Sequence, residues 1–124
     1  MRFLLFAASD LSAVTSGKRR VDIRLHEPDV HNLLQGELLT GVFGEGSVET
    51  KQVNLITQRS VRVIKACEVE DSEAQAAGYA SALDFRQRLM RHDPTVTEES
   101  LVAVNHFEVD LRSPMHHSQK PLFL

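Results

Sequence analysis

The sequence predicts a small α+β domain, a mixed β-barrel of about six strands with two or three short helices. Three observations support this fold class. Val21–Leu25 alternates apolar and polar residues, which is typical of a strand. Gly44-Glu45-Gly46 separates two strand-like runs and predicts a hairpin turn. Phe85 and Leu89, four residues apart, give a later segment the apolar stripe of a helix.

The composition fits one such domain. The chain has 124 residues, of which 42% are hydrophobic and 25% charged, so it can bury a core and remain an ordinary globular protein. One cysteine excludes an intramolecular disulfide. The apolar run at the N-terminus is too short for a signal peptide or a membrane span, which predicts a cytoplasmic protein without a membrane partner.

The N-terminal part predicts two strands joined by a helix. The short apolar run Arg2–Ala7 predicts a fully buried first strand. Ser9 or Asp10 can cap a helix of about two turns, which Gly17 ends. The second strand is Val21–Leu25, with its three apolar residues toward a core and its polar residues on the other face.

The middle of the chain predicts a helical turn and three strands. The apolar spacing of Val30–Leu34 predicts about one turn of helix. Glu37–Phe43 and Val48–Thr57 are the expected arms of the hairpin. Val61–Val69 has β-branched character and predicts a long strand, in which Cys67 is expected to be a buried small hydrophobe.

The C-terminal part predicts a helix and a last strand. Glu68–Glu73 is acidic and is expected to be solvated. Ser81, with Asp84 three residues later, resembles a capping box at the start of a helix that ends near His92. Leu101–Leu111 alternates with some irregularity and predicts the last strand. We therefore expect one domain over residues 1–111.

Residues 112–124 have the composition of a mobile tail. The tail ends in Pro-Leu-Phe-Leu, and its apolar side chains predict packing on the chain's own domain or on a second copy, which would make a homo-oligomer.

Gly17–Leu25 is the basic stretch of an otherwise acidic chain. Residues 17–24 carry four of the fourteen basic residues and one acidic residue, a local charge of +3, whereas the whole chain has −3. Side chains two apart on a strand lie roughly 7 Å apart, so Asp22 is expected between the guanidiniums of Arg20 and Arg24. Two interpretations stay open: a solvated face with a structural ion pair, or a phosphate-binding site.

Within this stretch, Gly17, Arg19, Asp22 and Arg24 resemble the G-x-K-x-x-E-x-R signature of ASCH domains, small β-barrels related to the PUA domain of RNA-modifying proteins. Arg and Asp stand where Lys and Glu are usual. Downstream, Ala77-Gly78-Tyr79 with Ser81 and Asp84-Phe85 is similar to the family's E-G-F-x-S-x-x-E-F stretch. The resemblance covers about residues 1–111. It implies a PUA-like barrel that binds RNA, a nucleotide or a nucleoside in a cleft lined by the basic stretch.

The candidate ligand-binding residues are the basic stretch and one aromatic side chain. Arginines bind phosphate with forked hydrogen bonds, an acidic residue can orient them or accept from a base, and a tyrosine can stack on a base. These roles fall on Lys18, Arg19, Arg20, Asp22, Arg24 and Tyr79. The sequence has no nucleotide-loop motif and no close histidine pair with metal-site spacing, so we expect neither a cofactor nor a metal.

The alternative is an enzyme, since the resemblance also implies amidohydrolases acting on N4-acetylcytidine and nucleases acting on RNA. The residues corresponding to the amidohydrolase Lys, Thr and Glu are Arg19, Asp22 and Ala77. Arginine stays charged and cannot act as the base, and alanine transfers no proton. Asp22 is the one catalytic candidate, so the sequence favours a binding module over an enzyme.

Overall fold

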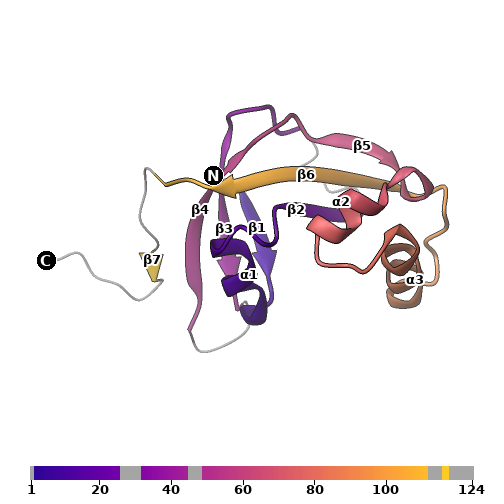
Figure 1. The fold of residues 1–124 in the computed structure, drawn as a ribbon, viewed down its shortest axis with the longest axis horizontal. Coiled ribbons are helices and arrows are strands. Elements are labelled where there is room, and N and C mark those ends of the chain that lie inside the picture. Colours follow the sequence, from indigo (N-terminus) through magenta and orange to yellow (C-terminus); the bar gives the residue numbers. More distant parts are fainter. Residues whose placement is uncertain (1, 26–31, 45–48, 112–115, 118–124) are drawn as a thin grey trace, which may run out of the picture.

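A curled β-sheet forms a half-barrel in the computed structural model (Figure 1), which describes residues 2–25, 32–44, 49–111 and 116–117. The strand order is β1-β3-β4-β6-β2, with β5 also paired to β6 and the two-residue β7 to β4. The elements in chain order are β1 (Phe3–Phe6), the 3-10 turn η1 (Ala8–Asp10), α1 (Leu11–Thr15), β2 (Val21–Leu25), β3 (Leu38–Phe43), β4 (Lys51–Thr57), β5 (Arg62–Lys65), the 3-10 turn η2 (Ala66–Glu68), α2 (Asp71–Ala76), α3 (Ala82–His92), β6 (Leu101–Val109) and β7 (His116–His117).

This arrangement confirms the predicted α+β fold class with its barrel-like sheet and short helices. β3 and β4 pair antiparallel, as predicted for the arms of the hairpin, in register from Leu38 opposite Ile56 to Phe43 opposite Lys51. Residues 45–48, where the turn is predicted, lie outside the described residues. Ser81 caps α3 as predicted, because its hydroxyl accepts a hydrogen bond from the Asp84 N–H. Among the described residues, no helix is long and apolar enough to cross a membrane.

The long strand β6 separates two apolar cores because successive side chains point to opposite faces of a strand. Phe107 lies on one face, in a core with β1, β3, β4 and α1 that contains Phe6 and Phe43. Val102 and Val104 lie on the other face, in a core that α2 and α3 complete with Phe85. In Figure 1, α1 lies beside β1 and β3, whereas α2 and α3 lie toward the other end of β6.

Five expectations about the elements and their residues are wrong. β1 is not fully buried: Phe3 and Leu5 are exposed, since β1 pairs only with β3 among the described strands and covers the core with one face. The long strand ends at Lys65, where η2 begins and its backbone N–H groups bond to the loop at residues 98–100 instead of to a strand. Cys67 therefore falls outside the strand alternation and is exposed.

The other two corrections concern an acidic segment and a helical turn. Glu73 is buried, because α2 begins at Asp71 and turns Glu73 toward β6. Residues 32–36 form a turn and not a helix, although Leu33 is buried as expected; Val30 lies outside the described residues. Of the predicted tail, only His116–His117 is described, and it pairs with Lys51 and Gln52 of β4.

Candidate functional site

The basic turn, residues 17–20, connects α1 to β2. Gly17 has a φ of 81°, a left-handed conformation that glycine adopts at little cost, and this ends α1 as predicted. The next residues are held by their backbone: Arg19 N–H donates to the Ala13 carbonyl at 2.8 Å, and Arg20 N–H to the Ala76 carbonyl at 3.0 Å. The turn is thus bonded to α1 on one side and to the end of α2 on the other.

β2 has two buried faces, so its polar residues are not on a solvated surface. Val21 and Ile23 lie in the core under α2 and α3. Asp22, on the opposite face, is only 3% exposed. Its carboxylate accepts from Arg24 Nε at 2.7 Å and from Arg19 Nη2 at 3.3 Å. The structural ion pair is therefore present, with Arg19 in the place expected for Arg20.

Arg19 and Arg24 both lie over the ring of Phe6. Their guanidinium carbons are 5.0 and 5.5 Å from the ring centroid, within the range of a cation–π contact. Arg19 also pairs with Asp10 at 3.0 Å, so Asp10 binds an arginine instead of capping α1. Arg24 additionally donates to the Leu5 carbonyl. Two carboxylates, two guanidiniums and an aromatic ring thus form one connected cluster at the edge of the core.

Asn105 extends this polar cluster into the sheet. It lies directly opposite Asp22 in the β2–β6 register and is 2% exposed. Neither its amide nitrogen nor its amide oxygen has a hydrogen-bond partner among the described residues. A buried carboxamide normally finds a partner or an ordered water, so Asn105 offers one donor group and one acceptor beside the Asp22 carboxylate.

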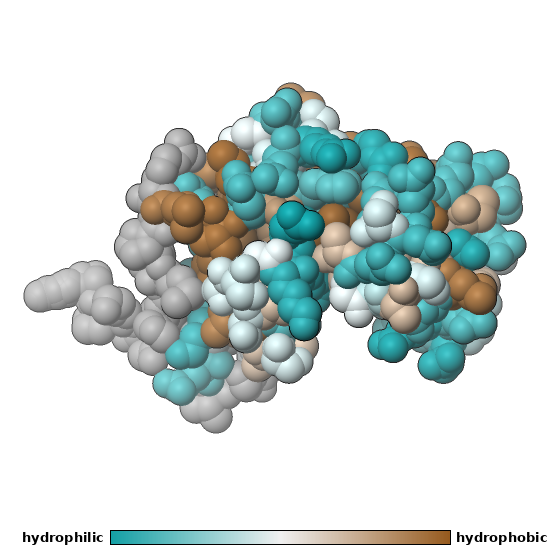
Figure 2. Space-filling model, viewed as in Figure 1, coloured by the Kyte–Doolittle hydropathy of each residue, from teal (hydrophilic) through white to brown (hydrophobic). Residues whose placement is uncertain are grey.

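A cavity of about 360 Å³ lies between α1 and the segment that joins α2 to α3. Figure 2 shows the surface notched between these two parts of the molecule. The cavity brings together three of the predicted ligand-binding residues, Lys18, Arg19 and Tyr79. Asp10, Ala13, Ala77 and Gly78 complete its lining. Tyr79 packs edge-to-face on Phe85 at 5.3 Å between centroids, and burial raises the pKa of its phenol.

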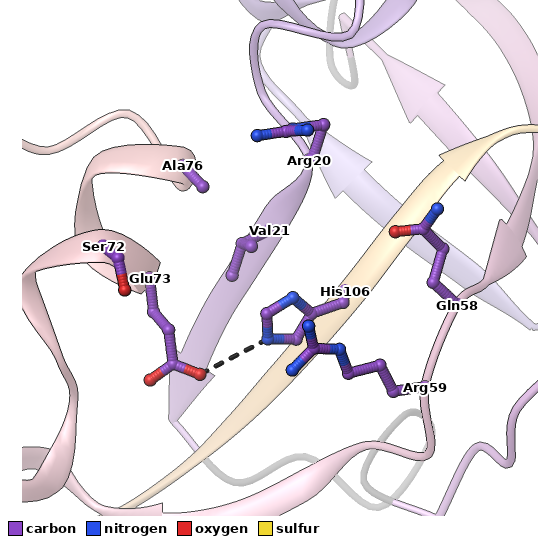
Figure 3. A pocket seen from close by; sticks show the side chains of 8 residues that line it. All are labelled: Arg20, Val21, Gln58, Arg59, Ser72, Glu73, Ala76 and His106. Atoms are coloured by element: carbon purple, nitrogen blue, oxygen red, sulfur yellow. Dashed lines mark hydrogen bonds and ion pairs between the residues drawn. The ribbon is translucent and has the colours of Figure 1, made fainter.

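Arg20 lines a different cavity, of about 230 Å³, on the α2 side of β2. There Glu73 on α2 meets His106 on β6, with 3.3 Å between Oε2 and Nε2 (Figure 3). Glu73 also forms an ion pair with Arg62 on β5. Burial lowers the pKa of His106, and the nearby Arg59 and Arg62 act in the same direction, whereas the bond to Glu73 opposes the shift. His106 is therefore mostly neutral at pH 7.

The structure thus divides the predicted site residues into three groups. Lys18, Arg19 and Tyr79 share one cavity, Arg20 lines another, and Asp22 and Arg24 are held in the ion-pair cluster that Arg19 connects to the first cavity. The pair of Glu73 and His106 was not predicted from the sequence. One signal was available for His106: it shares a face of the last strand with Val102 and Val104, which is an unusual place for a solvated histidine.

We predict that stability falls more steeply below pH 6.5 in the wild type than in His106→Gln. The folded-state pKa of His106 is depressed, so its contribution is complete above the unfolded value of 6.5 and is lost as the unfolded chain takes up a proton at lower pH. Urea denaturation at pH 7.5 and 5.5 measures the difference. His92→Gln, at an exposed position on α3, is the control and should keep the wild-type pH dependence. Parallel curves for wild type and His106→Gln would contradict the prediction.

No metal cluster is present in the described part of the chain: no three His, Cys, Asp or Glu side chains come together. His26, which the sequence places at the end of the basic stretch, lies outside the described residues.

Comparisons with known proteins identify the fold. No protein-family model and no curated protein matches this sequence. Among solved structures, the hypothetical protein PH0355 superposes with a TM-score of 0.61 at 14% identity, over 89% of this chain and all of that one. The DUF984 protein EF3133 of Enterococcus faecalis gives 0.57 at 16% identity, over 86% of this chain and 75% of that one. An ASCH domain of Lactobacillus crispatus gives 0.56 at 14% identity, over 85% and 79%. The chain has an ASCH-like fold.

Proposed function

We propose that this chain is a binding module for a nucleotide, either free or as part of single-stranded RNA, and that the cavity beside Arg19 is its site. The observation that supports this most directly is that Tyr79 lines the same hollow as Lys18 and Arg19, from which it is far apart in sequence. A volume of about 360 Å³ falls within the range of small-molecule sites, about 300–1,000 Å³. The ASCH-like fold is compatible with the proposal, since the sequence resemblance implies the same ligand class.

The charges around the cavity assign different roles to its two basic residues. Arg19 already pairs with Asp10 and Asp22, so most of its charge is compensated and its orientation is fixed. Lys18 is exposed and forms no ion pair with a described residue, which leaves its ammonium available for a phosphate. Tyr79 offers a ring for base stacking. A single uncompensated cation in the described lining predicts weak binding with a shallow salt dependence.

Hydrolysis is the less favoured function. Asp22, the one catalytic candidate, accepts hydrogen bonds from two guanidiniums, so both of its carboxylate oxygens are already engaged. Ala77 lines the cavity but has no proton to transfer. We therefore propose that the protein binds its ligand and does not deacetylate N4-acetylcytidine. If chromatography detects release of cytidine that Asp22→Ala abolishes, the enzyme becomes the favoured function and the binding module the alternative.

We predict that Lys18→Gln weakens RNA binding and flattens its salt dependence. The slope should fall by about 0.7, the value expected when a protein neutralises one phosphate fewer on a single strand. Tyr79→Leu should weaken binding about 5- to 100-fold, as expected when a base no longer stacks on a ring, whereas Tyr79→Phe should retain it. Fluorescence titration of short single-stranded RNA and of a mononucleotide at several salt concentrations measures both effects.

Lys65→Gln is the matched control, because Lys65, on β5, is also an exposed lysine and pairs with Glu99 away from the cavity. It should bind like the wild type. If Lys18→Gln and Tyr79→Leu both fold and keep the wild-type affinity and salt slope, this cavity is not the binding site.

A further inference from the structure

The second cavity, lined by Arg20, Gln58, Arg59, Ser72, Glu73 and His106, has its own chemistry. It lies between α2, the start of β2, β6 and the turn after β4. Figure 3 shows Arg20 and Arg59 at different edges of this hollow, with the His106 ring beside Arg59 and Glu73 facing that ring. None of the residues that form the nucleotide cavity lines this one.

Two positive charges at this cavity have no counter-charge among the described residues. The Glu73 carboxylate is shared by Arg62 and His106, so it is not available to either of the other arginines. Arg20 and Arg59 form no ion pair with a described residue. Two such guanidiniums around one hollow favour a doubly charged anion, since each can donate a charge-assisted hydrogen bond.

The size of the cavity and its uncharged hydrogen-bonding groups further limit the kinds of ligand that fit. A volume of about 230 Å³ is below the range of about 300–1,000 Å³ for drug-sized ligands, so the hollow suits a small charged group better than a whole nucleotide. Gln58 and Ser72 add an amide and a hydroxyl to the lining. The His106 ring can add an N–H, and an anion beside it would favour its protonated form.

We propose that this cavity is a second ligand site that takes a phosphoryl dianion between Arg20 and Arg59, with His106 beside it. The phosphoryl group belongs either to a small phosphorylated molecule or to the phosphorylated end of an RNA strand. The site does not depend on the proposed nucleotide cavity, because the two share no lining residue.

Sulfate is the probe of choice, because it remains a dianion at every pH at which His106 titrates. Sodium sulfate is added to the isotopically labelled full chain at pH 7.5, against sodium chloride of equal ionic strength, and the His106 ring signals are followed by NMR. We expect saturable shifts and a higher pKa of His106 when sulfate is bound. A linear, unsaturable response equal to that of chloride would overturn the proposal.

Arg20→Gln and Arg59→Gln should each weaken sulfate binding about 10-fold or more, as expected for the loss of a hydrogen bond from a charged group. Both side chains are exposed, so neither replacement opens a hole in the core. Arg91→Gln is the control: it removes the same charge from an exposed position on α3 and should bind sulfate normally. If all three variants bind sulfate with the wild-type affinity, neither Arg20 nor Arg59 contacts the anion, and the proposed site is rejected.

Further experiments show which molecule carries the phosphoryl group, and they also test this site independently of the nucleotide cavity. An RNA terminus is the source if a 5′-phosphorylated oligonucleotide binds more tightly than its unphosphorylated form and Arg59→Gln removes the difference. A small phosphate monoester that competes with sulfate, with no effect of the RNA 5′-phosphate, indicates a free molecule. Lys18→Gln should leave sulfate binding unchanged, so failure of the nucleotide cavity and failure of this site give different results.

Discussion

Replacing Asp22 with Asn is expected to lower the free energy of unfolding by about 3 kcal/mol or more, because it leaves two guanidiniums without their shared counter-charge. The Asp22 side chain is 4% exposed, and those of Arg19 and Arg24 are 17% and 22% exposed, so water can replace the missing carboxylate only in part. Urea denaturation at pH 7 with the midpoint and the slope determined separately measures the loss.

Glu98→Gln is the control for this replacement. Glu98 pairs with Arg86 at 3.6 Å, but its side chain is 61% exposed, and such surface pairs contribute no more than about 1 kcal/mol. If Asp22→Asn is no more destabilising than Glu98→Gln, the cluster at β2 contributes no more to stability than a surface ion pair. The conclusion that Asp22 fixes the orientation of Arg19 would then be wrong.

Phe6→Ala should be similarly costly, about 3–5 kcal/mol, the usual range for removing a buried aromatic ring. Phe6 is 5% exposed, stacks on Phe43 with ring centroids 4.7 Å apart and meets the ring of Phe107 edge-on at 6.0 Å. The Phe6 ring also supports Arg19 and Arg24, so the replacement should weaken nucleotide binding in protein that remains folded. Thermal and urea denaturation measure the first effect, and RNA titration measures the second.

Phe3→Ala removes the same side chain from the same strand at a position that is 50% exposed, and it should cost less than half as much. Phe6→Leu separates packing from the arginine contacts, because leucine refills part of the volume without offering a ring to the guanidiniums. Wild-type RNA affinity in folded Phe6→Leu would show that the ring is not needed to position Arg19.

The elements that the sequence predicted well are those whose signals are local. The alternation at Val21–Leu25 and the cap at Ser81 depend on neighbouring residues alone, and both elements have the expected type. The prediction of one long strand over Val61–Val69 was wrong, because the backbone of η2 forms hydrogen bonds with a loop that lies far along the chain. The strand propensity of a segment carries no information about such a distant hydrogen-bond partner. The β-branched residues of Val61–Val69 therefore favoured a longer strand than the one that forms.

The candidate site shows the same division between local and long-range information. The pairing of Asp22 with Arg24 followed from a spacing of two on a strand and is present at 2.7 Å. The partner arginine was wrong, because the turn at Gly17 sends Arg20 to the α2 side and brings Arg19 over Phe6. Asn105 and His106 lie beside β2 only because β6 pairs with it. The spacing of residues within one segment does not reveal which strands pair, so neither the unpartnered amide of Asn105 nor the pair of Glu73 with His106 could be predicted.

The position of β2 at the end of the strand order has a consequence for the order of events during synthesis. Among the described strands, β2 pairs with β6 alone, with Val21 opposite His106 and Leu25 opposite Val102. Pairings between segments so far apart in the chain form late, because a long loop must close first. Until the ribosome has made β6, Asp22 and its arginines have no partner strand to pair with. We therefore expect the two proposed sites to form only after β6 has been synthesised, so a growing chain that still lacks β6 should not bind a ligand there.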